Sequence, residues 1–299
     1  MRNWVRLRAP AKVNLHLEVI RQRHDGYHEI ETVLQAIGLY DTLRVALVEP
    51  RRGGEPRVEL LVTPTGSAPE GDDNLCLRAV RLFCQRLRVS GHLQIELTKE
   101  IPAGSGLGGG SSDAMASLMA CDRLFGTGLE PEQLADLGAS LGSDVPFFLA
   151  GGTALGRGLG TDLTPLPAIR MGHFLVVKPN YDLATAAVYA GLKLGLTVRS
   201  NVANIQVIKP LIARFPAGTW FGYNRLEEVV LPAHPELQRA LVRLRDATPV
   251  AMMTGSGSAL FGVFLEEGSA ELMASRIRSD FPYVRCVLPH PAGVQFLEE

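Results

Sequence analysis

The N-terminal third of the chain alternates hydrophobic and polar residues with the period of a β-strand. Over residues 13–19, valine and leucine occupy the odd positions, whereas asparagine, histidine and glutamate occupy the even ones. Because successive side chains of a strand point to opposite faces, this alternation predicts a half-buried strand. A polar turn over residues 21–27, centred on Asp25 and Gly26, follows it. Further strands are predicted over residues 42–48, 57–62 and 93–97.

Between the last two predicted strands, the hydrophobic period changes to that of a helix. Residues 74–87 place five hydrophobic side chains on one helical face: Leu75, Ala79, Leu82, Phe83 and Leu87. A second helix is predicted over residues 113–125. A third opens near Pro131, since proline suits the first helical position, and Gly142 can close it.

The second half of the chain mixes strand and helix signals without an internal repeat. Glycines over residues 151–160 indicate a hairpin. We then expect strands over residues 174–177 and 259–265, and helices over residues 185–192 and 235–245. Such a mixed order favours an α+β fold. The proline-containing stretch 164–167 is the expected junction between two domains, residues 1–165 and residues 166–299.

Composition supports a folded chain of two domains that share a cleft. Of the 299 residues, 46% are hydrophobic and 20% are charged, which allows a substantial core. The formal net charge is -1 and the charges are scattered, so a nucleic-acid partner is not expected. No stretch approaches the ~20 apolar residues of a membrane span, and the first residues lack an apolar leader segment. We therefore expect a cytoplasmic protein without a membrane or an obligate protein partner.

The four cysteines do not have the spacing of a metal site. None belongs to a C-x-x-C pair, and none has a histidine at metal-ligand spacing, which argues against zinc. Three of the four lie in apolar helical patterns, where a free cysteine behaves as a small hydrophobic residue. A disulfide framework is not expected in a chain with so large a core.

The most informative segment is a glycine-rich run of eleven residues: Pro102, Ala103, Gly104, Ser105, Gly106, Leu107, Gly108, Gly109, Gly110, Ser111 and Ser112. Five glycines within seven positions allow backbone N–H groups to close around an anion. The two serines fall where a helix is expected to begin, and the unpaired N–H groups of a helix start favour a phosphate. A flexible linker is the alternative, but linkers do not usually lead directly into an apolar helix.

The kind of phosphate site is not settled by the glycines alone. Gly104, Gly106 and Gly109 fit the G-x-G-x-x-G pattern of dinucleotide-binding folds, which is a weak signal by itself. However, the run does not follow directly on the strand that ends near Leu97, and several strands precede it. No lysine follows the last glycine, which excludes a Walker A loop. Another group must therefore neutralise the phosphate charge.

These residues resemble a known family, the galactokinase, homoserine kinase, mevalonate kinase and phosphomevalonate kinase (GHMP kinase) superfamily. Its hallmark is a Pro-x-Gly-x-Gly-Leu-Gly loop before Ser-Ser and a helix. Four segments resemble the branch that acts on a methylerythritol carrying a cytidine diphosphate group, and a fifth resembles the third glycine motif of the superfamily. These segments are Pro10–Leu15, Asp25–Glu29, Gly108–Ser112, Leu141–Phe148 and Thr254–Ser258.

The resemblance implies a fold and an activity. The N-terminal domain is expected to be a β-α domain of the ribosomal protein S5 type, and the C-terminal domain a ferredoxin-like α/β sandwich. The implied activity is transfer of a phosphoryl group from ATP to the 2-hydroxyl of the diphosphocytidyl methylerythritol, in the non-mevalonate isoprenoid pathway. Mg²⁺ is expected to be held mainly by the ATP phosphates, because no carboxylate cluster indicates a metal site, so no metal ligand is assigned.

The resemblance also implies catalytic roles. By itself, Asp144 reads as a helix cap; the resemblance makes it the general base that accepts the proton of the acceptor hydroxyl. Lys12 by itself could guard a sheet edge. The resemblance places it beside Asp144, where an ammonium would keep the carboxylate ionised and stabilise the transferred phosphoryl group. Lys99 is expected to reach the nucleotide, with a solvent-facing lysine as the alternative.

Five further residues are implied on the acceptor side. Asn14 shares a strand face with Lys12 and is expected to contact the substrate. Tyr27 and His28, which by themselves read as packing and capping residues, are expected to stack on the cytidine base and hydrogen-bond its edge. Thr185 and Tyr189 are expected to complete that pocket.

Two segments depart from the family pattern, and three alternative functions remain. Arg225 stands where the family more often has aspartate, and Asn180–Leu183 replaces a smaller, less polar turn. One alternative is a kinase of homoserine, mevalonate or a sugar, against which the cytidine motif at residues 25–28 argues. A non-catalytic nucleotide-binding protein would not need both Lys12 and Asp144. A dinucleotide-dependent oxidoreductase would need a strand running directly into the glycines.

Overall fold

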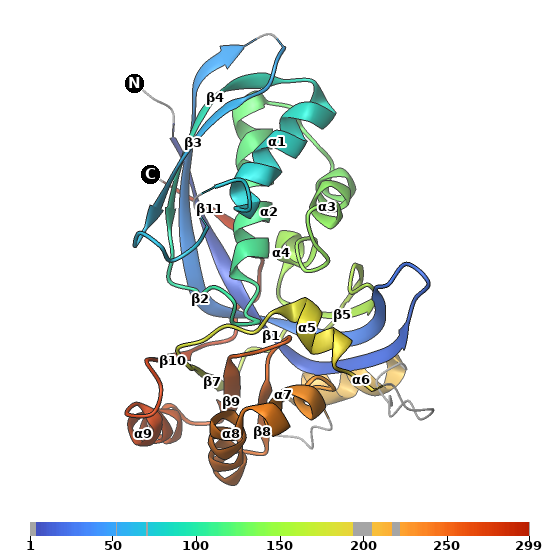
Figure 1. The fold of residues 1–299 in the computed structure, drawn as a ribbon, viewed down its shortest axis with the longest axis vertical. Coiled ribbons are helices and arrows are strands. Elements are labelled where there is room, and N and C mark those ends of the chain that lie inside the picture. The colour runs from blue at the N-terminus through green and yellow to red at the C-terminus, as the bar shows by residue number, and fades with distance from the viewer. Residues whose placement is uncertain (1–3, 52, 70, 194–204, 217–221, 299) are drawn as a thin grey trace.

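The computed structural model describes residues 4–298, except residues 52, 70, 194–204 and 217–221. These residues form two β-sheets with helices packed on each (Figure 1). The first sheet contains β1 (Trp4–Gln22), β2 (His28–Arg51), β3 (Arg57–Thr63), β4 (Ser90–Thr98), β5 (Thr153–Gly158), β6 (Asp162–Pro165) and β11 (Gln295–Leu297). The second contains β7 (His173–Lys178), β8 (Val250–Met253), β9 (Leu260–Phe264) and β10 (Tyr283–Val287).

The first sheet has the order β11-β1-β2-β4-β3, with β5 beside the first part of β2 and β6 beside β5. All of these pairs are antiparallel except β3 with β4. One face of the sheet carries α1 (Leu75–Leu87), α2 (Gly109–Phe125), α3 (Pro131–Ala139) and the short α4 (Phe147–Ala150) (Figure 1). Residues of this sheet and of α1 and α2 share one hydrophobic core.

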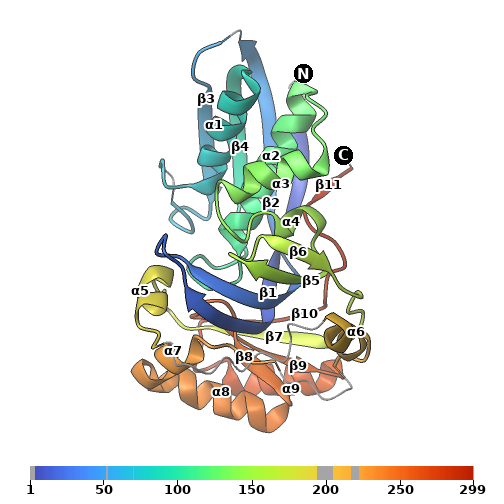
Figure 2. The same ribbon diagram turned by 90° about the vertical axis from the view of Figure 1, so that its right-hand side faces the viewer.

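The second sheet is antiparallel throughout, with the order β10-β7-β9-β8. Its outer face is covered by α8 (Pro235–Ala247) and α9 (Glu267–Ile277), with α7 (Glu227–Ala233) beside them (Figure 2). The remaining described helices, α5 (Thr185–Ala190) and α6 (Ile205–Ala213), lie on opposite sides of the molecule, at the left and the right of Figure 2. In the described part of the chain, no helix is both long enough and apolar enough to cross a membrane.

The long strands β1 and β2 connect the two sheets. Leu7 of β1 belongs to the core beneath α1 and α2, whereas Val13 and Leu15 pack with Phe174 and Phe261 of the second sheet. The hairpin formed by β1 and β2 therefore crosses from one half of the molecule into the other (Figure 2). A single strand pair thus supplies residues to both cores.

The predicted strand over residues 13–19 is present, but it is not half-buried. Its polar residues Asn14, His16 and Glu18 are 3%, 1% and 1% exposed. Burial of the polar face cannot be read from alternation, because alternation distinguishes the two faces and not what covers each of them. Of these three residues, Asn14 belongs to the site described below, whereas His16 and Glu18 lie on the opposite face of β1, because the pairing with β2 shifts register between Asn14 and His16.

Most predicted elements appear near their expected bounds, and the α+β class is confirmed. Asn74 caps α1, its side-chain oxygen accepting a hydrogen bond from the backbone N–H of Cys76 at 2.8 Å. The chain passes from the first sheet to the second between Pro165 and His173, close to the expected junction. Because β11 returns to pair with β1, the division of domains at residue 165 stays a prediction.

Candidate active site

The glycine-rich loop adopts a backbone conformation that favours glycine at every second position. Gly104, Gly106 and Gly108 have φ angles of 58°, 77° and 75°. Residues with a Cβ rarely adopt such angles, so these positions require glycine for conformational reasons alone. The resulting turns lead the chain from β4 into the N-terminus of α2.

Helix α2 begins at Gly109 and not at Asp113, so the predicted start was four residues late. The cause is local: Gly108 caps the helix, and its carbonyl oxygen accepts the first helical hydrogen bond from the N–H of Ser112 at 2.9 Å. The N–H groups of residues 109–111 precede that bond. Together with the helix dipole, they make this end of α2 suited to an anion such as a phosphate.

The loop is held between the two halves of the molecule. The N–H of Lys12 donates to the carbonyl oxygen of Leu107 at 2.9 Å, and the hydroxyl of Thr254 donates to that of Gly106 at 3.2 Å. A Cβ on Gly106 would collide with the backbone carbonyl of Thr254. The predicted phosphate loop and the third glycine motif, residues 254–258, are therefore in direct contact.

Lys12 and Asp144 lie beside this loop and beside each other. The Lys12 ammonium is 3.3 Å from Oδ2 of Asp144, and the side chains are 3% and 37% exposed. A Cβ on Gly108 would lie 3.1 Å from Cε of Lys12, so this side chain runs along the cap of α2. The structure thus brings together an anion-binding helix end, a buried cation and an accessible carboxylate.

Asn14 holds this arrangement together. Its Oδ1 accepts hydrogen bonds from the Lys12 ammonium at 2.8 Å and from the N–H of Gly255 at 2.9 Å. Its Nδ2 donates to the hydroxyl of Thr32 at 2.8 Å. Asn14 therefore fixes the position of Lys12 and joins β1 to the 254–258 loop.

Two of the aromatic residues expected on the acceptor side, His28 and Tyr189, lie together. The rings of His28 and Tyr189 lie 5.1 Å apart at an angle of 37°. Burial, and then the nearby charge of Asp144, raise the pKa of the Tyr189 hydroxyl, which places this ring within electrostatic reach of the carboxylate. Tyr27 precedes His28 on the turn, and 66% of its surface is exposed and available to a ligand.

Thr185 connects α5 to the third glycine motif. Its hydroxyl lies 2.8 Å from the hydroxyl of Ser256. Because Tyr189 belongs to the same helix, this contact fixes the position of Tyr189 relative to the 254–258 loop. All five residues expected on the acceptor side come from elements that border Lys12 and Asp144: β1, β2 with its preceding turn, and α5.

Lys99, which is expected to reach the nucleotide, takes part in a buried cluster of charges. Its ammonium is buried between the carboxylates of Asp41 and Asp113, with the latter at 2.8 Å. Asp41 also accepts hydrogen bonds from the N–H groups of Glu100 and Ile101 at 2.7 and 2.9 Å. Through Asp41 and Asp113, Lys99 thus helps to fix the chain on both sides of the glycine loop. This buried position does not by itself indicate a contact between Lys99 and the nucleotide. The sequence did not indicate this cluster, whose members come from separate elements.

The two segments that depart from the family pattern are now explained in part. In the Asn180–Leu183 turn, Asp182 forms an ion pair with Lys178 at 2.8 Å and packs directly against Gly104 of the loop. Arg225 lies 2.9 Å from Glu228 and 4.0 Å from Glu18, so its charge is balanced by carboxylates.

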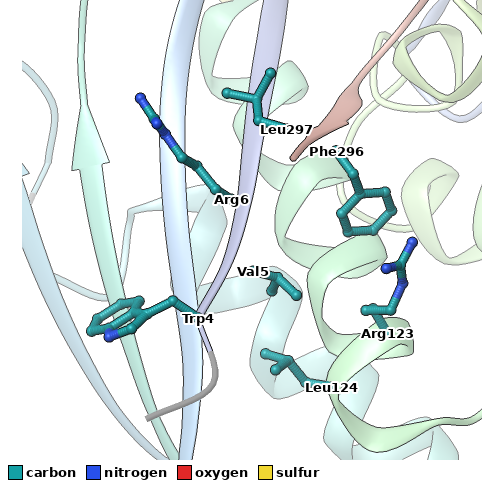
Figure 3. A pocket seen from close by; sticks show the side chains of 7 residues that line it. All are labelled: Trp4, Val5, Arg6, Arg123, Leu124, Phe296 and Leu297. Carbon is teal, nitrogen blue, oxygen red and sulfur yellow. The ribbon is translucent and has the colours of Figure 1, made fainter. Parts of the chain in front are cut away.

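A separate hollow lies at the other end of α2 (Figure 3). It is lined by Trp4, Val5, Arg6, Arg123, Leu124, Phe296 and Leu297. Since α2 has 17 residues at ~1.5 Å each, this hollow is roughly 25 Å from the glycine loop and forms no part of the site. Within the residues that the structure describes, no group of three or more His, Cys, Asp or Glu is placed to hold a metal ion.

Comparison with known proteins agrees with this geometry. The family model for the GHMP kinases N terminal domain matches residues 74–152, and that for the GHMP kinases C terminal matches residues 211–282. A 4-diphosphocytidyl-2-C-methyl-D-erythritol kinase of Solibacter usitatus is 40% identical over 88% of this chain and 82% of its own length. One from Moorella thermoacetica is 39% identical over 92% of this chain and 95% of its own length.

Solved structures agree as well. A crystal structure of 4-(cytidine 5'-diphospho)-2C-methyl-D-erythritol kinase superimposes with a TM-score of 0.75 at 33% identity, covering 96% of this chain and 99% of that chain. Homoserine kinase from Cytophaga hutchinsonii gives a TM-score of 0.77 at 19% identity over 99% of this chain and 98% of its own, which shows a shared fold.

Fold and site together define the class of protein as the GHMP kinases, with the two-domain architecture of that class. ATP is therefore its phosphoryl donor. Within this class, the chain belongs to the family of 4-diphosphocytidyl-2-C-methyl-D-erythritol kinases.

Proposed function

We propose that this chain transfers the γ-phosphoryl group of ATP to the 2-hydroxyl of 4-diphosphocytidyl-2-C-methyl-D-erythritol. The observation that carries this proposal is the pair of Lys12 and Asp144 beside the start of α2. Phosphoryl transfer requires positioning and neutralisation of charge, with a base for the attacking hydroxyl. The acceptor is the one that the relatives' names give.

In this mechanism, Asp144 accepts the proton of the acceptor hydroxyl, which its 37% exposure leaves accessible. The hydroxyl oxygen forms a bond to the γ-phosphorus, the bond from that phosphorus to the β,γ-bridging oxygen breaks, and ADP leaves. Lys12 stabilises the negative charge that develops on the transferred group. The N–H groups at the start of α2 hold the phosphates of ATP.

Mg²⁺ would be held mainly by the ATP phosphates and would supply positive charge there. One protein atom near the loop fits such a role. The hydroxyl of Ser112, in the first turn of α2, is buried and has no hydrogen-bond partner among the described residues. A hydroxyl oxygen is a ligand type that Mg²⁺ accepts.

Recognition of the acceptor is assigned to the aromatic residues Tyr27, His28 and Tyr189. Tyr27 and Tyr189 offer ring faces to the cytosine base, and His28 offers a ring nitrogen to its edge. Homoserine and mevalonate have no base to occupy such a group. The three aromatic side chains therefore favour the diphosphocytidyl acceptor over homoserine and mevalonate, the acceptors of related kinases.

A panel assay tests this function. The protein is incubated with ATP, Mg²⁺ and, separately, the diphosphocytidyl methylerythritol, homoserine, mevalonate and galactose, and ADP release is followed. We expect release with the diphosphocytidyl acceptor alone. Release with one of the other acceptors and not with this one would refute the proposed acceptor. No release with any of them would refute a kinase function.

A further inference from the structure

The 254–258 loop is held by a buried side chain from another part of the chain, Asn224. This residue is 2% exposed, and its Nδ2 donates hydrogen bonds to the carbonyl oxygens of Met253 at 2.8 Å and of Gly255 at 2.7 Å. Its Oδ1 accepts from the N–H of Leu226 at 2.9 Å. Because an amide group has two donor hydrogens, both are used on the end of β8 and the loop that follows it.

Asn224 is itself held in place by the backbone of β1. The N–H of Leu17 donates to the carbonyl oxygen of Tyr223 at 2.7 Å, and the N–H of Arg225 donates to that of Leu17 at 2.8 Å. These two hydrogen bonds lie on either side of Asn224 and attach its segment to the strand that carries Lys12. The side chain of Asn224 therefore connects a fixed segment beside β1 to the loop.

A second side chain of the same segment supports the start of the loop. Oε1 of Glu227 accepts from the N–H of Met253 at 2.8 Å, and its Oε2 accepts from the guanidinium of Arg245 at 2.7 Å. Met253 is thus held at its N–H by Glu227 and at its carbonyl oxygen by Asn224. The last residue of β8 is therefore fixed on both sides, and the loop starts from a defined position.

Gly255 is the point where this support reaches the site. Its carbonyl oxygen accepts from Asn224, and its N–H donates to Oδ1 of Asn14 at 2.9 Å. The same oxygen of Asn14 accepts from the Lys12 ammonium at 2.8 Å. A Cβ on Gly255 would lie 3.4 Å from Nζ of Lys12, so the loop also lies against this ammonium. A continuous chain of contacts therefore runs from Asn224 to Lys12, with Asp144 at its end.

We propose that Asn224 is a positioning residue of the kinase: it anchors the 254–258 loop, and through Gly255 and Asn14 it fixes the ammonium of Lys12. This inference rests on the proposed function in that Lys12 acts on the transferred phosphoryl group. A displacement of a reacting group by about 1 Å can lower turnover about 100-fold, even when the substitution lies away from the chemistry. Loss of the anchor at Asn224 should therefore lower turnover through Lys12.

Asn224→Ser separates this role from the local turn that leads into α7. The serine hydroxyl can still accept from the N–H of Leu226, but with one hydrogen it cannot bond both carbonyl oxygens. We expect kcat at saturating ATP and acceptor to fall about 10- to 100-fold. In a Lys12→Ala background, the same substitution should change kcat by less than about twofold, because no ammonium is left to be displaced.

Thr248→Val is the matched control. Thr248 is also buried and also donates a hydrogen bond to a backbone carbonyl of the second sheet, that of Val263, at the end of β9 away from the 254–258 loop. Both substitutions should lower the melting temperature, but Thr248→Val should leave kcat unchanged. A merely structural role of Asn224 would give an unchanged kcat in Asn224→Ser, or a kcat reduced by the same factor with and without Lys12. Either result would overturn the proposal.

Amide hydrogen exchange followed by mass spectrometry tests the anchor without turnover. Peptides that cover residues 254–258 should exchange faster in Asn224→Ser than in the wild type, whereas in Thr248→Val they should not. Unchanged exchange over this loop in Asn224→Ser would overturn the proposal. If the wild type phosphorylates a different acceptor in the panel, the proposed acceptor fails, and kcat is compared with that acceptor. A wild-type kcat in Lys12→Ala alone would refute the catalytic role of Lys12, and the exchange result would then decide the anchoring by itself.

Discussion

At the scale of single residues, Asn14 shows how a side chain can serve catalysis through its neighbours. Its Oδ1 accepts from Lys12 and Gly255, and one of its two amide hydrogens goes to Thr32. One amide hydrogen is left for a substrate. The expected substrate contact of Asn14 thus stays a prediction, while its role in orienting Lys12 is visible in the structure.

The Lys12–Asp144 pair supports a prediction about turnover. Asp144→Asn removes the base and Lys12→Ala removes the cation beside it. Each should lower kcat by about 100- to 10,000-fold, the usual contribution of general acid–base catalysis, because both act on the reacting groups. The KM for ATP should change little, since the loop and α2 hold the nucleotide. Steady-state ADP release at varied ATP measures both constants.

A surface aspartate provides the control for this pair. Asp280 forms an exposed ion pair with Arg243. Asp280→Asn makes the same chemical change away from the site and should leave both constants unchanged. Near-normal turnover in Asp144→Asn or Lys12→Ala would remove that residue from the mechanism.

The sequence identified individual site residues to very different degrees. Asp144 and Lys12 were assigned only through the family resemblance, because taken alone an aspartate reads as a cap and a lysine as an edge residue. The pairing of Lys99 with carboxylates was not predicted, because its partner Asp41 is 58 residues away in sequence and on another strand. No local pattern contains that separation. Ion pairs between distant elements are therefore the part of the site that sequence patterns missed.

At the scale of elements, the loop before α2 is constrained twice, by its φ angles and by its contact with the 254–258 loop. Gly106 and Gly126 allow these constraints to be separated. Gly106 precedes α2 and Gly126 follows it, and their φ angles are 77° and 64°. A Cβ on Gly126 would meet nothing within 4 Å. Gly126 therefore has the conformational constraint without the steric one.

This comparison predicts different outcomes for two alanine substitutions. Gly126→Ala should lower the free energy of unfolding by about 1 kcal/mol, the cost of a left-handed alanine, and leave the KM for ATP unchanged. Gly106→Ala should raise the KM for ATP severalfold or more, because the loop must move away from Thr254. Urea unfolding and ATP kinetics test both. Equal kinetic effects would show that the contact with Thr254 is unimportant.

The buried cluster beneath the loop predicts a pH effect on stability. Burial raises the pKa of the Asp113 carboxyl to about 8, with Lys99 opposing the rise and Asp41 adding to it. In an unfolded chain the pKa of aspartate is about 4. Between these values the folded protein binds a proton that the unfolded chain has lost, so this group makes stability fall as pH rises from about 4 to about 8.

Asp113→Asn removes this titration. The free energy of unfolding of the wild type, minus that of the variant, should decrease with rising pH by at most about 1.4 kcal/mol per unit between about pH 5 and pH 8. Urea unfolding of both proteins across this range measures the difference. A difference independent of pH would show that the Asp113 carboxyl is ionised throughout.

Periodicity was sufficient for elements with one clear hydrophobic face and insufficient for others. The helix α1 and the strands β3 and β4 were predicted within a few residues. The start of α2 was missed because glycines have low helix propensity, and the conformation of Gly108 that begins the helix has no hydrophobic pattern. The short strand β11 was also missed, since its three residues pair only through tertiary contact with β1.

At the scale of the whole molecule, the two halves are connected through shared core residues. Leu15 of β1 is fully buried among residues of the second sheet, including Phe174 and Phe261, although β1 belongs to the first sheet. The site lies along this connection, since Lys12 and Asn14 come from β1 and Gly255 from the other half. Folding of one half should therefore depend on the other.

This dependence predicts a single unfolding transition. Leu15→Ala should lower the free energy of unfolding by about 2–5 kcal/mol, the usual cost of a cavity at a buried leucine. In both the wild type and the variant, loss of activity, far-UV circular dichroism and calorimetry should report one coincident transition. Two separate transitions in either protein would show that the halves fold independently.

The two buried faces of β1 have a consequence for tolerance to substitution. In β4, buried and partly exposed residues alternate, so every second position, such as His92, Gln94 and Glu96, has room for other side chains. Residues 9–19 of β1 are buried without interruption, on both faces of the strand. Saturation mutagenesis in cells whose growth depends on this enzyme should show tolerated substitutions at alternate positions of β4. Across these eleven positions of β1 it should show none, so the strand is expected to be the least variable stretch of its length in the sheet.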